Sequence, residues 1–504
     1  MDTLLAHGLG GRSDLPLNGT AAIVGGGVAV LASFLALTVA WRRPRLRPDG
    51  GRLLPAALAG ALGSPALTVA GRAAALAAAA GVVAVALAGP PGEDENLAPW
   101  ALYVTFWVGL VPVSVLAGPV WRRVNPLRTL HAALCRLLRT DPAGRRPPVR
   151  AGYWPAAAWL TGFVWLELVA PHRANPRLVG ALICGYAAIN VAAALRYGSG
   201  WFARGDGFEV YSTLLARLCP LGRRPDGRLV VRTPLAGLAG VRPEPGLTAV
   251  ACVLIGSTAF DGITRTTYWR DTVDPSSVVA GTVGLATAIA VVAVVYLAAM
   301  WACAALTASP AVASAVPAGR EGAVPADTPA AAAALAPVGP AGETGASSGT
   351  PARRAAGRPD AGAPESASAG VPESVSSRRR AAALAGRFAP TLLPIALGYT
   401  VAHYFSFLLL EGQMTVILAS DPFGAGWDLL GTAGHRIDYD LAGPALVAQV
   451  QVNAIVLGHI AATIASHDLA LRVCPPGRAV RGQLPVAVVM VALTCAGLFA
   501  LLSG

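Results

Sequence analysis

Residues 277–305 read SVVAGTVGLATAIAVVAVVYLAAMWACAA and contain no charged side chain. The hydrocarbon core of a bilayer is about 30 Å thick, so a helix needs about 20 apolar residues to cross it. Because lipid offers no partner to backbone polar groups, an apolar stretch of this length is expected to be a transmembrane helix. Its length lets it tilt or extend into water.

Nine further apolar stretches predict the same structure, so the expected fold is an all-α integral membrane protein with a bundle of about ten transmembrane helices. The composition agrees, because 54% of the residues are hydrophobic and only 13% are charged. The N-terminal residues lack the charged and early apolar regions of a cleaved signal peptide, so the first span is expected to stay in the mature protein. The other expected spans are 20–40, 73–89, 100–120, 153–170, 178–196, 247–262, 389–410, 444–467 and 485–502.

The basic residues predict the orientation of these spans. All 39 are Arg, and an outside N-terminus places 33 of them in loops on the cytoplasmic side. This asymmetry is typical of a multi-pass protein of the bacterial inner (cytoplasmic) membrane. The net charge of +12 does not predict a nucleic-acid partner, because the Arg residues flank apolar runs instead of forming a basic domain with interleaved aromatic residues.

The chain is expected to have three parts: a membrane domain with seven helices in 1–306, a linker in 307–388 and a membrane domain with three helices in 389–504. The linker is rich in Ala, Pro, Gly and Ser and is expected to be disordered and cytoplasmic. The run of three Arg at 378–380 either binds anionic headgroups or only directs topology.

Two of the loops that are expected on the cytoplasmic side contain sequence patterns that predict secondary structure. Residues 121–152 predict an amphipathic helix at the membrane surface, and residues 196–246 predict a short helix followed by a hairpin around the turn sequence RPDG. The seven Cys residues have no metal-binding or disulfide spacing and are expected to be small core residues.

Ionisable residues inside spans are costly and therefore mark candidate functional sites. Glu167 and Asp261 lie near the outer ends of the fourth and sixth spans. His403 lies within the eighth span, and Glu411 follows it towards the outer side. His403 and Glu411 are eight residues apart and are expected to share one broad helix face. We expect an outward-facing polar pocket between the fourth, sixth, eighth and ninth spans, in which these residues are the catalytic candidates.

The ninth span carries further polar residues. With about 100° per residue, Gln449, Asn453, His459 and His467 fall within an arc of roughly 120°, whereas Gln451 points elsewhere. The arc predicts a face turned away from lipid. Gln449, Asn453 and His459 are candidates for a proton relay or for polar packing between helices, and His467 is expected at the inner boundary.

The outer loop 411–443 adds four Asp residues and His435 to an acidic outer face. Carboxylates and imidazoles bind hydrolytic metals, so a divalent metal is compatible with this face, but the sequence identifies no cofactor. The calculated depths of His403 and His459 differ by about 10 Å. Such a spread favours a relay of protonatable groups over one metal held by both residues.

Five strings resemble a family of bacterial polytopic membrane proteins labelled fenitrothion hydrolase. They are VWRRVNPLRTL (120–130), GRRPDGRLVVRTPLAGL (222–238), FDGITRTTYW (260–269), AHYFSFLLLEGQ (402–413) and GHIAATIASHDLALR (458–472). The resemblance covers most spans but not the linker, and it transfers no catalytic residues. It implies hydrolysis of an apolar phosphotriester that partitions from the bilayer.

Three functions therefore stay open. The first is a membrane hydrolase that acts on apolar organophosphate-type esters, with a small apolar substrate as its partner. The second is a proton-coupled secondary transporter built from two five-span halves, in which His and carboxylate residues carry the coupling protons. The third is a noncatalytic membrane scaffold whose basic loops recruit partners.

Overall fold

The computed structural model describes residues 19–144, 149–308 and 373–502, which form helices joined by loops and three short strands. By its internal contacts the chain divides into one unit of residues 1–308 and 377–504 and a second unit of residues 309–376. The helices are α1 Gly19–Ala40, α2 Ala56–Leu62, α3 Pro65–Ala88, α4 Leu97–Pro99, α5 Leu110–Ala117, α6 Val120–Val124, α7 Pro126–Leu138, α8 Trp154–Leu168, α9 Pro176–Tyr197, α10 Phe202–Gly205, α11 Gly207–Leu215, α12 Leu247–Thr264, α13 Thr267–Thr272, α14 Val278–Thr307, α15 Glu373–Phe388, α16 Leu393–Ser406, α17 Gly412–Ser420, α18 Pro444–Val473 and α19 Ala479–Leu502.

Nine helical stretches within the described residues are long and apolar enough to cross a membrane. They indicate an all-α, multi-pass membrane protein. Each overlaps one of the ten expected spans, although Ala56–Ala88 and Ser377–Ser420 extend well beyond the expected 73–89 and 389–410. The stretches are Gly19–Ala40, Ala56–Ala88, Leu97–Ala117, Pro176–Tyr197, Leu247–Thr264, Val278–Thr307, Ser377–Ser420, Pro444–Val473 and Ala479–Leu502.

The remaining expected span, 153–170, corresponds to α8, which has only 15 residues. A helix of this length rises about 22 Å, less than the thickness of the hydrocarbon core. Ala156, Leu160 and Val164 on one side of α8 are buried against the bundle. Although α8 is too short to cross the hydrocarbon core on its own, its contacts with neighbouring helices hold it in the bundle.

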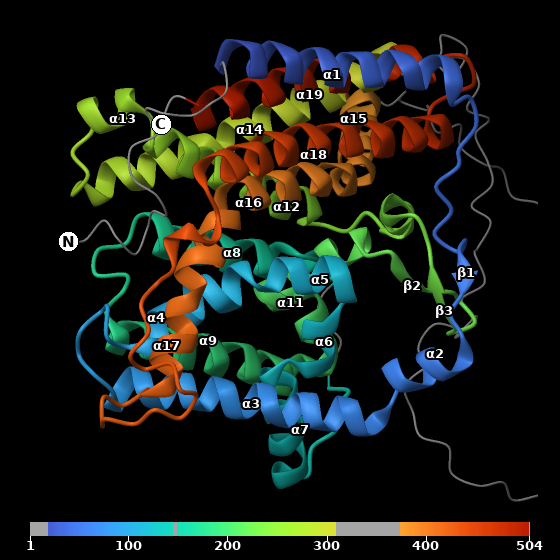
Figure 1. Ribbon diagram of the computed structural model, residues 1–504. Coiled ribbons are helices and arrows are strands. Elements are labelled where there is room, and N and C mark those ends of the chain that lie inside the picture. The colour runs from blue at the N-terminus through green and yellow to red at the C-terminus, as the bar shows by residue number, and fades with distance from the viewer. Residues whose placement is uncertain (1–18, 145–148, 309–372, 503–504) are drawn as a thin grey trace, which may run out of the picture. The chain divides into compact units, whose positions relative to one another are not determined.

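The helix α18 lies between α16, α19 and α1, and α14 packs against α12 and α19, as Figure 1 shows. Two glycines bring α16 and α18 close together. A Cβ atom on Gly398 would lie 2.5 Å from the Ala454 carbonyl oxygen, and one on Gly458 would lie 2.7 Å from the Pro394 oxygen. Small residues let membrane helices approach closely enough for extensive van der Waals contact.

A second set of helices contacts the group formed by α1, α12, α14, α16, α18 and α19. The connection is made by α8, which contacts both α12 and α11. In the second set, α3 packs along α9, and α7 packs against α9 (Figure 1). Two π-helical stretches interrupt the helices that meet here: η1, Trp100–Val108, and η8, Phe407–Glu411. These stretches contact each other and lie beside the candidate site. Such stretches are frequent at functional sites.

The helix and the hairpin that were expected in the two basic loops are both present. The amphipathic segment forms α7, with Leu127 and His131 buried and Leu137 exposed. The RPDG turn joins strands β2, Leu221–Arg223, and β3, Leu229–Val231, which pair antiparallel. A third strand, β1, Arg52–Leu53, pairs with the other edge of β3, a partner that the hairpin pattern did not predict.

The expected linker boundaries were wrong at the C-terminal end. The middle of the linker, 309–372, lies outside the described residues, but α15 extends to Phe388. The side chains of Ala385 and Phe388 are buried, and the hydroxyl of Tyr296 donates to the Ala385 carbonyl oxygen at 2.7 Å. Ala, Arg and Leu favour helix, and the apolar residues are spaced to cover one face, so this segment packs although its composition resembles the linker.

Candidate acid–base site

Asp261 and His403 meet inside the bundle. Asp261 lies on α12 and His403 on α16, and both side chains are buried. His403 Nδ1 lies 3.3 Å from Asp261 Oδ2, and Arg265 Nη2, one turn further along α12, lies 3.1 Å from the same oxygen. The carboxylate therefore has an imidazole on one side and a guanidinium on the other, and this arrangement compensates a negative charge that is costly at membrane depth.

Glu167 of α8 forms a second pair beside the first. The hydroxyl of Tyr404, the residue after His403, donates to Glu167 Oε1 at 2.9 Å. Glu167 Oε2 is inaccessible to solvent and has no hydrogen-bond partner among the described residues. A buried carboxyl oxygen without a partner is costly, so this atom has the capacity to bind a proton or a water molecule.

A small cavity lies against Glu167 and Tyr404. It leaves about 10 Å³ for the centre of a water molecule, which is roughly the space that one water requires. Its polar lining is completed by side chains of α11, α12 and α16: Tyr211, Ser257, Thr258 and Thr400. Trp107 of η1 also lines it. The expectation that the ninth span helps to build this pocket was wrong, because no residue of α18 lines the cavity.

Glu411 lies apart from these two pairs. It belongs to the π-helical stretch η8 and is buried, and its Oε1 lies 3.4 Å from the hydroxyl of Tyr439 in the loop before α18. The expectation that Glu411 shares one face with His403 assumed a regular α-helix. A π-helical stretch has more residues per turn, so it changes the angle between the two side chains.

The predicted polar face of α18 was wrong for two of its members. Gln449 and Asn453 are exposed, whereas Gln451, expected to point elsewhere, is buried. The buried face includes Gly458 and His459. The residue spacing predicts the angles between side chains around a helix, but it does not predict which side of the helix faces the bundle. In α18 the small residues that pack against α16 determine which side is buried.

His459 is buried at the contact between α16 and α18. Its Nδ1 lies 2.8 Å from the Ile455 carbonyl oxygen, and its ring meets the ring of Tyr399 edge-on at 5.7 Å. Its Nε2 is buried without a hydrogen-bond partner among the described residues. Tyr399 lies one turn before His403 on α16, and its hydroxyl donates to the Leu493 carbonyl oxygen at 2.8 Å.

Polar side chains continue from His459 along the buried face of α18. Thr463 donates to the His459 carbonyl oxygen at 2.8 Å, and Ser466 donates to Thr391 Oγ1 at 2.9 Å. His467 was expected at the membrane boundary but is buried, with Nδ1 2.9 Å from Gln483 Oε1. From His459 the helix rises about 14 Å to Asp468.

Sequence reasoning missed a second buried polar cluster, in the loops rather than the spans. Glu209 of α11 is fully buried, and Arg128 Nη2 lies 2.5 Å from its Oε1. Asn125 donates to both Asp206 and Glu209, at 2.8 and 3.1 Å. Burial raises the pKa of Asp206. The detectable signal was the helix-capping pattern, since Asn125 caps α7 and Asp206 caps α11.

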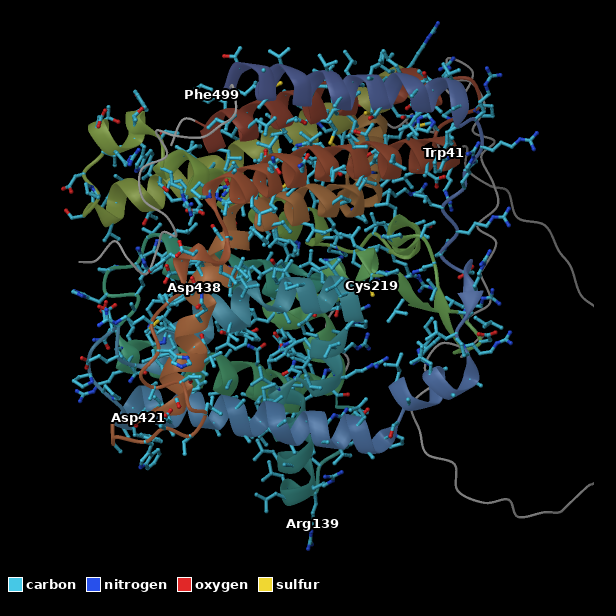
Figure 2. The ribbon with its side chains drawn as sticks, viewed as in Figure 1. Trp41, Arg139, Cys219, Asp421, Asp438 and Phe499 are labelled. Atoms are coloured by element: carbon cyan, nitrogen blue, oxygen red, sulfur yellow. The ribbon has the colours of Figure 1, made fainter. Side chains whose placement is uncertain are left out.

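The loop between α17 and α18 uses its carboxylates to hold its own backbone. Asp421 accepts from the N–H groups of Ala425 and Gly426, at 2.9 and 2.8 Å (Figure 2 labels Asp421). Asp428 accepts from the Ser420 hydroxyl at 2.6 Å. In the described part of the chain, no group of three His, Cys, Asp or Glu side chains is arranged to hold a metal ion.

Comparisons with family models, curated proteins and solved structures find no match to this chain. The fold and the site therefore define its class on their own: a multi-pass α-helical membrane protein with an acid–base cluster buried between α8, α12 and α16.

Proposed function

We propose that this protein moves protons through its helix bundle and couples them to the passage of a solute. The acid–base centre consists of Asp261, His403, Glu167 and Tyr404. One observation carries the proposal: α18, which packs along α16, has further buried polar side chains, among them His459, Thr463 and Ser466. Ionisable and hydroxyl side chains in such a series are typical of proton relays in pumps and transporters.

Two of the buried atoms that lack a hydrogen-bond partner among the described residues support this proposal. Glu167 Oε2 and His459 Nε2 are both buried and have no hydrogen-bond partner within the described residues. Each is an atom to which a proton or a water can bind, and the cavity at Glu167 has room for about one water. A proton therefore has a buried acceptor on α8 and another on α18.

The test is proton flux into vesicles that contain the purified protein and a pH-sensitive dye. His459→Leu removes the second acceptor and should abolish the flux, whereas Asn453→Leu, on the exposed face of the same helix, should leave it unchanged. Equal flux in both variants would show that the polar residues of α18 only pack. Candidate solutes are then screened by their effect on this flux.

A second candidate is hydrolysis of an apolar phosphotriester, which the resemblance implies. The carboxylate of Asp261, 3.3 Å from Nδ1 of His403, favours it, because a negative charge beside an imidazole stabilises the protonated ring that forms when His403 acts as a base. His403 would take a proton from water, the oxygen would form a bond to phosphorus, and the leaving alcohol oxygen would depart and receive a proton. Ester turnover that survives His459→Leu but not His403→Gln would support the hydrolase.

A further inference from the structure

We propose that a cavity at the Arg-rich end of the bundle binds the phosphate of an anionic phospholipid headgroup. The cavity lies between α15, α18, the segment after α1 and the turn Pro234–Gly240. It leaves about 60 Å³ for water-sized centres, several times the space that one water requires. This volume suits a phosphate group with part of its glycerol ester.

Two arginines supply the positive charge of the cavity. Arg387 of α15 and Arg472 of α18 both line it. Arg387 is exposed and forms no ion pair among the described residues. Arg472 uses Nε and Nη2 on Asp468 and the Leu46 carbonyl oxygen, which leaves its Nη1 to donate. Guanidinium groups bind phosphate oxygens through paired N–H donors.

The single carboxylate of the lining is already compensated. Asp468 Oδ1 accepts from the indole of Trp41 at 3.2 Å and from the backbone N–H groups of Arg45 and Leu46, while Oδ2 accepts from Arg472. Figure 2 labels Trp41 beside this end of α18. Five N–H donors compensate the negative charge of Asp468. This carboxylate therefore orients Arg472 and does not neutralise the positive charge of Arg387.

The remaining lining points to a lipid rather than a free anion. Leu238, Val241, Pro390 and Leu469 line the same cavity, so a charged wall and an apolar wall face each other. The cavity also lies where helices long enough to cross a membrane end, and where the segment after α1 carries Arg42, Arg43, Arg45 and Arg47. An amphiphile with a phosphate and an ester-linked glycerol matches both walls.

The test is native mass spectrometry of the full chain in detergent, with phosphatidylglycerol or phosphatidylcholine added. Arg387→Gln should weaken phosphatidylglycerol binding about tenfold, since it removes charge-assisted hydrogen bonds. Arg387→Lys should retain part of the binding. Arg481→Gln is the matched control, because Arg481 is also exposed near this end of the bundle but does not line the cavity.

Three results would overturn the proposal. Equal losses in Arg387→Gln and Arg481→Gln would mean that charge attracts the lipid without a site. Equal binding of phosphatidylcholine and phosphatidylglycerol would exclude selection for an anionic headgroup. Inorganic phosphate that displaces phosphatidylglycerol completely at millimolar concentration would assign the cavity to a soluble phosphate instead.

Discussion

Two glycines set the distance between α16 and α18 and so determine where the neighbouring histidines lie. Gly398 and Gly458 face each other across the helix contact, each with a backbone oxygen at less than 3 Å from the position of an added Cβ. His459 follows Gly458 directly, and its ring reaches Tyr399, the residue after Gly398. The position of His459 therefore depends on Gly398 and Gly458, because a side-chain methyl group at either position would push the two helices apart.

Gly458→Ala should lower the stability of the protein, because the new Cβ would lie 2.7 Å from the Pro394 oxygen and the helices must separate. Overpacking of this kind costs about 1–3 kcal/mol. Thermal unfolding in detergent measures the loss. Gly185→Ala on α9 is the control, since no atom outside its helix lies within 4 Å of the added Cβ. If both variants melt at the same temperature, the close contact between α16 and α18 is absent.

Among the helices, the sequence predicted well which segments form long apolar helices, but it predicted poorly which side of each helix packs against its neighbours. Apolar length alone locates the nine long helices, as the stretch around Val278–Thr307 illustrates. It does not reveal that the exposed face of α18 carries Asn453, since hydropathy does not identify neighbours. The pairing of Glu167 with Tyr404 joins residues 237 positions apart, a contact that no local pattern encodes.

The loop between α17 and α18 owes its form to carboxylates, and this makes it sensitive to acid. The N–H group of Ala433, followed by the hydroxyl of Ser420, holds the pKa of Asp428 below its ordinary value of 3.8. Because the pKa is lowered in the folded loop, the stabilisation is complete above pH 3.8 and is lost as the pH falls through the folded pKa.

Cleavage by pepsin within 421–443 should therefore increase steeply as the pH is lowered below 3.8. Asp428→Asn removes this titrating group, so the increase in cleavage at low pH should be smaller in the variant than in the wild-type protein. The same steep increase in Asp428→Asn would assign the acid sensitivity to another group.

At the scale of the whole molecule, the Arg distribution predicts that the loop 421–443 and the β2–β3 hairpin lie on opposite sides of the membrane. In a Cys-less background, a single Cys at Ala425 should react with an impermeant maleimide in intact cells, and one at Asp226 should react only after lysis. Both native residues are exposed, so the fold does not shield either position from the maleimide. Labelling of Asp226 alone in intact cells would reverse the orientation.

The central claim is that the buried pair of Asp261 and His403 carries protons, and proton flux in vesicles tests it most directly. Under an imposed pH gradient and with the membrane potential clamped, the wild-type protein should acidify the vesicle interior faster than protein-free vesicles. His403→Gln, which keeps hydrogen bonding but removes titration, should reduce the rate to that of protein-free vesicles. His435→Gln, in the loop between α17 and α18, should keep the wild-type rate. A folded His403→Gln variant with undiminished flux would contradict the account.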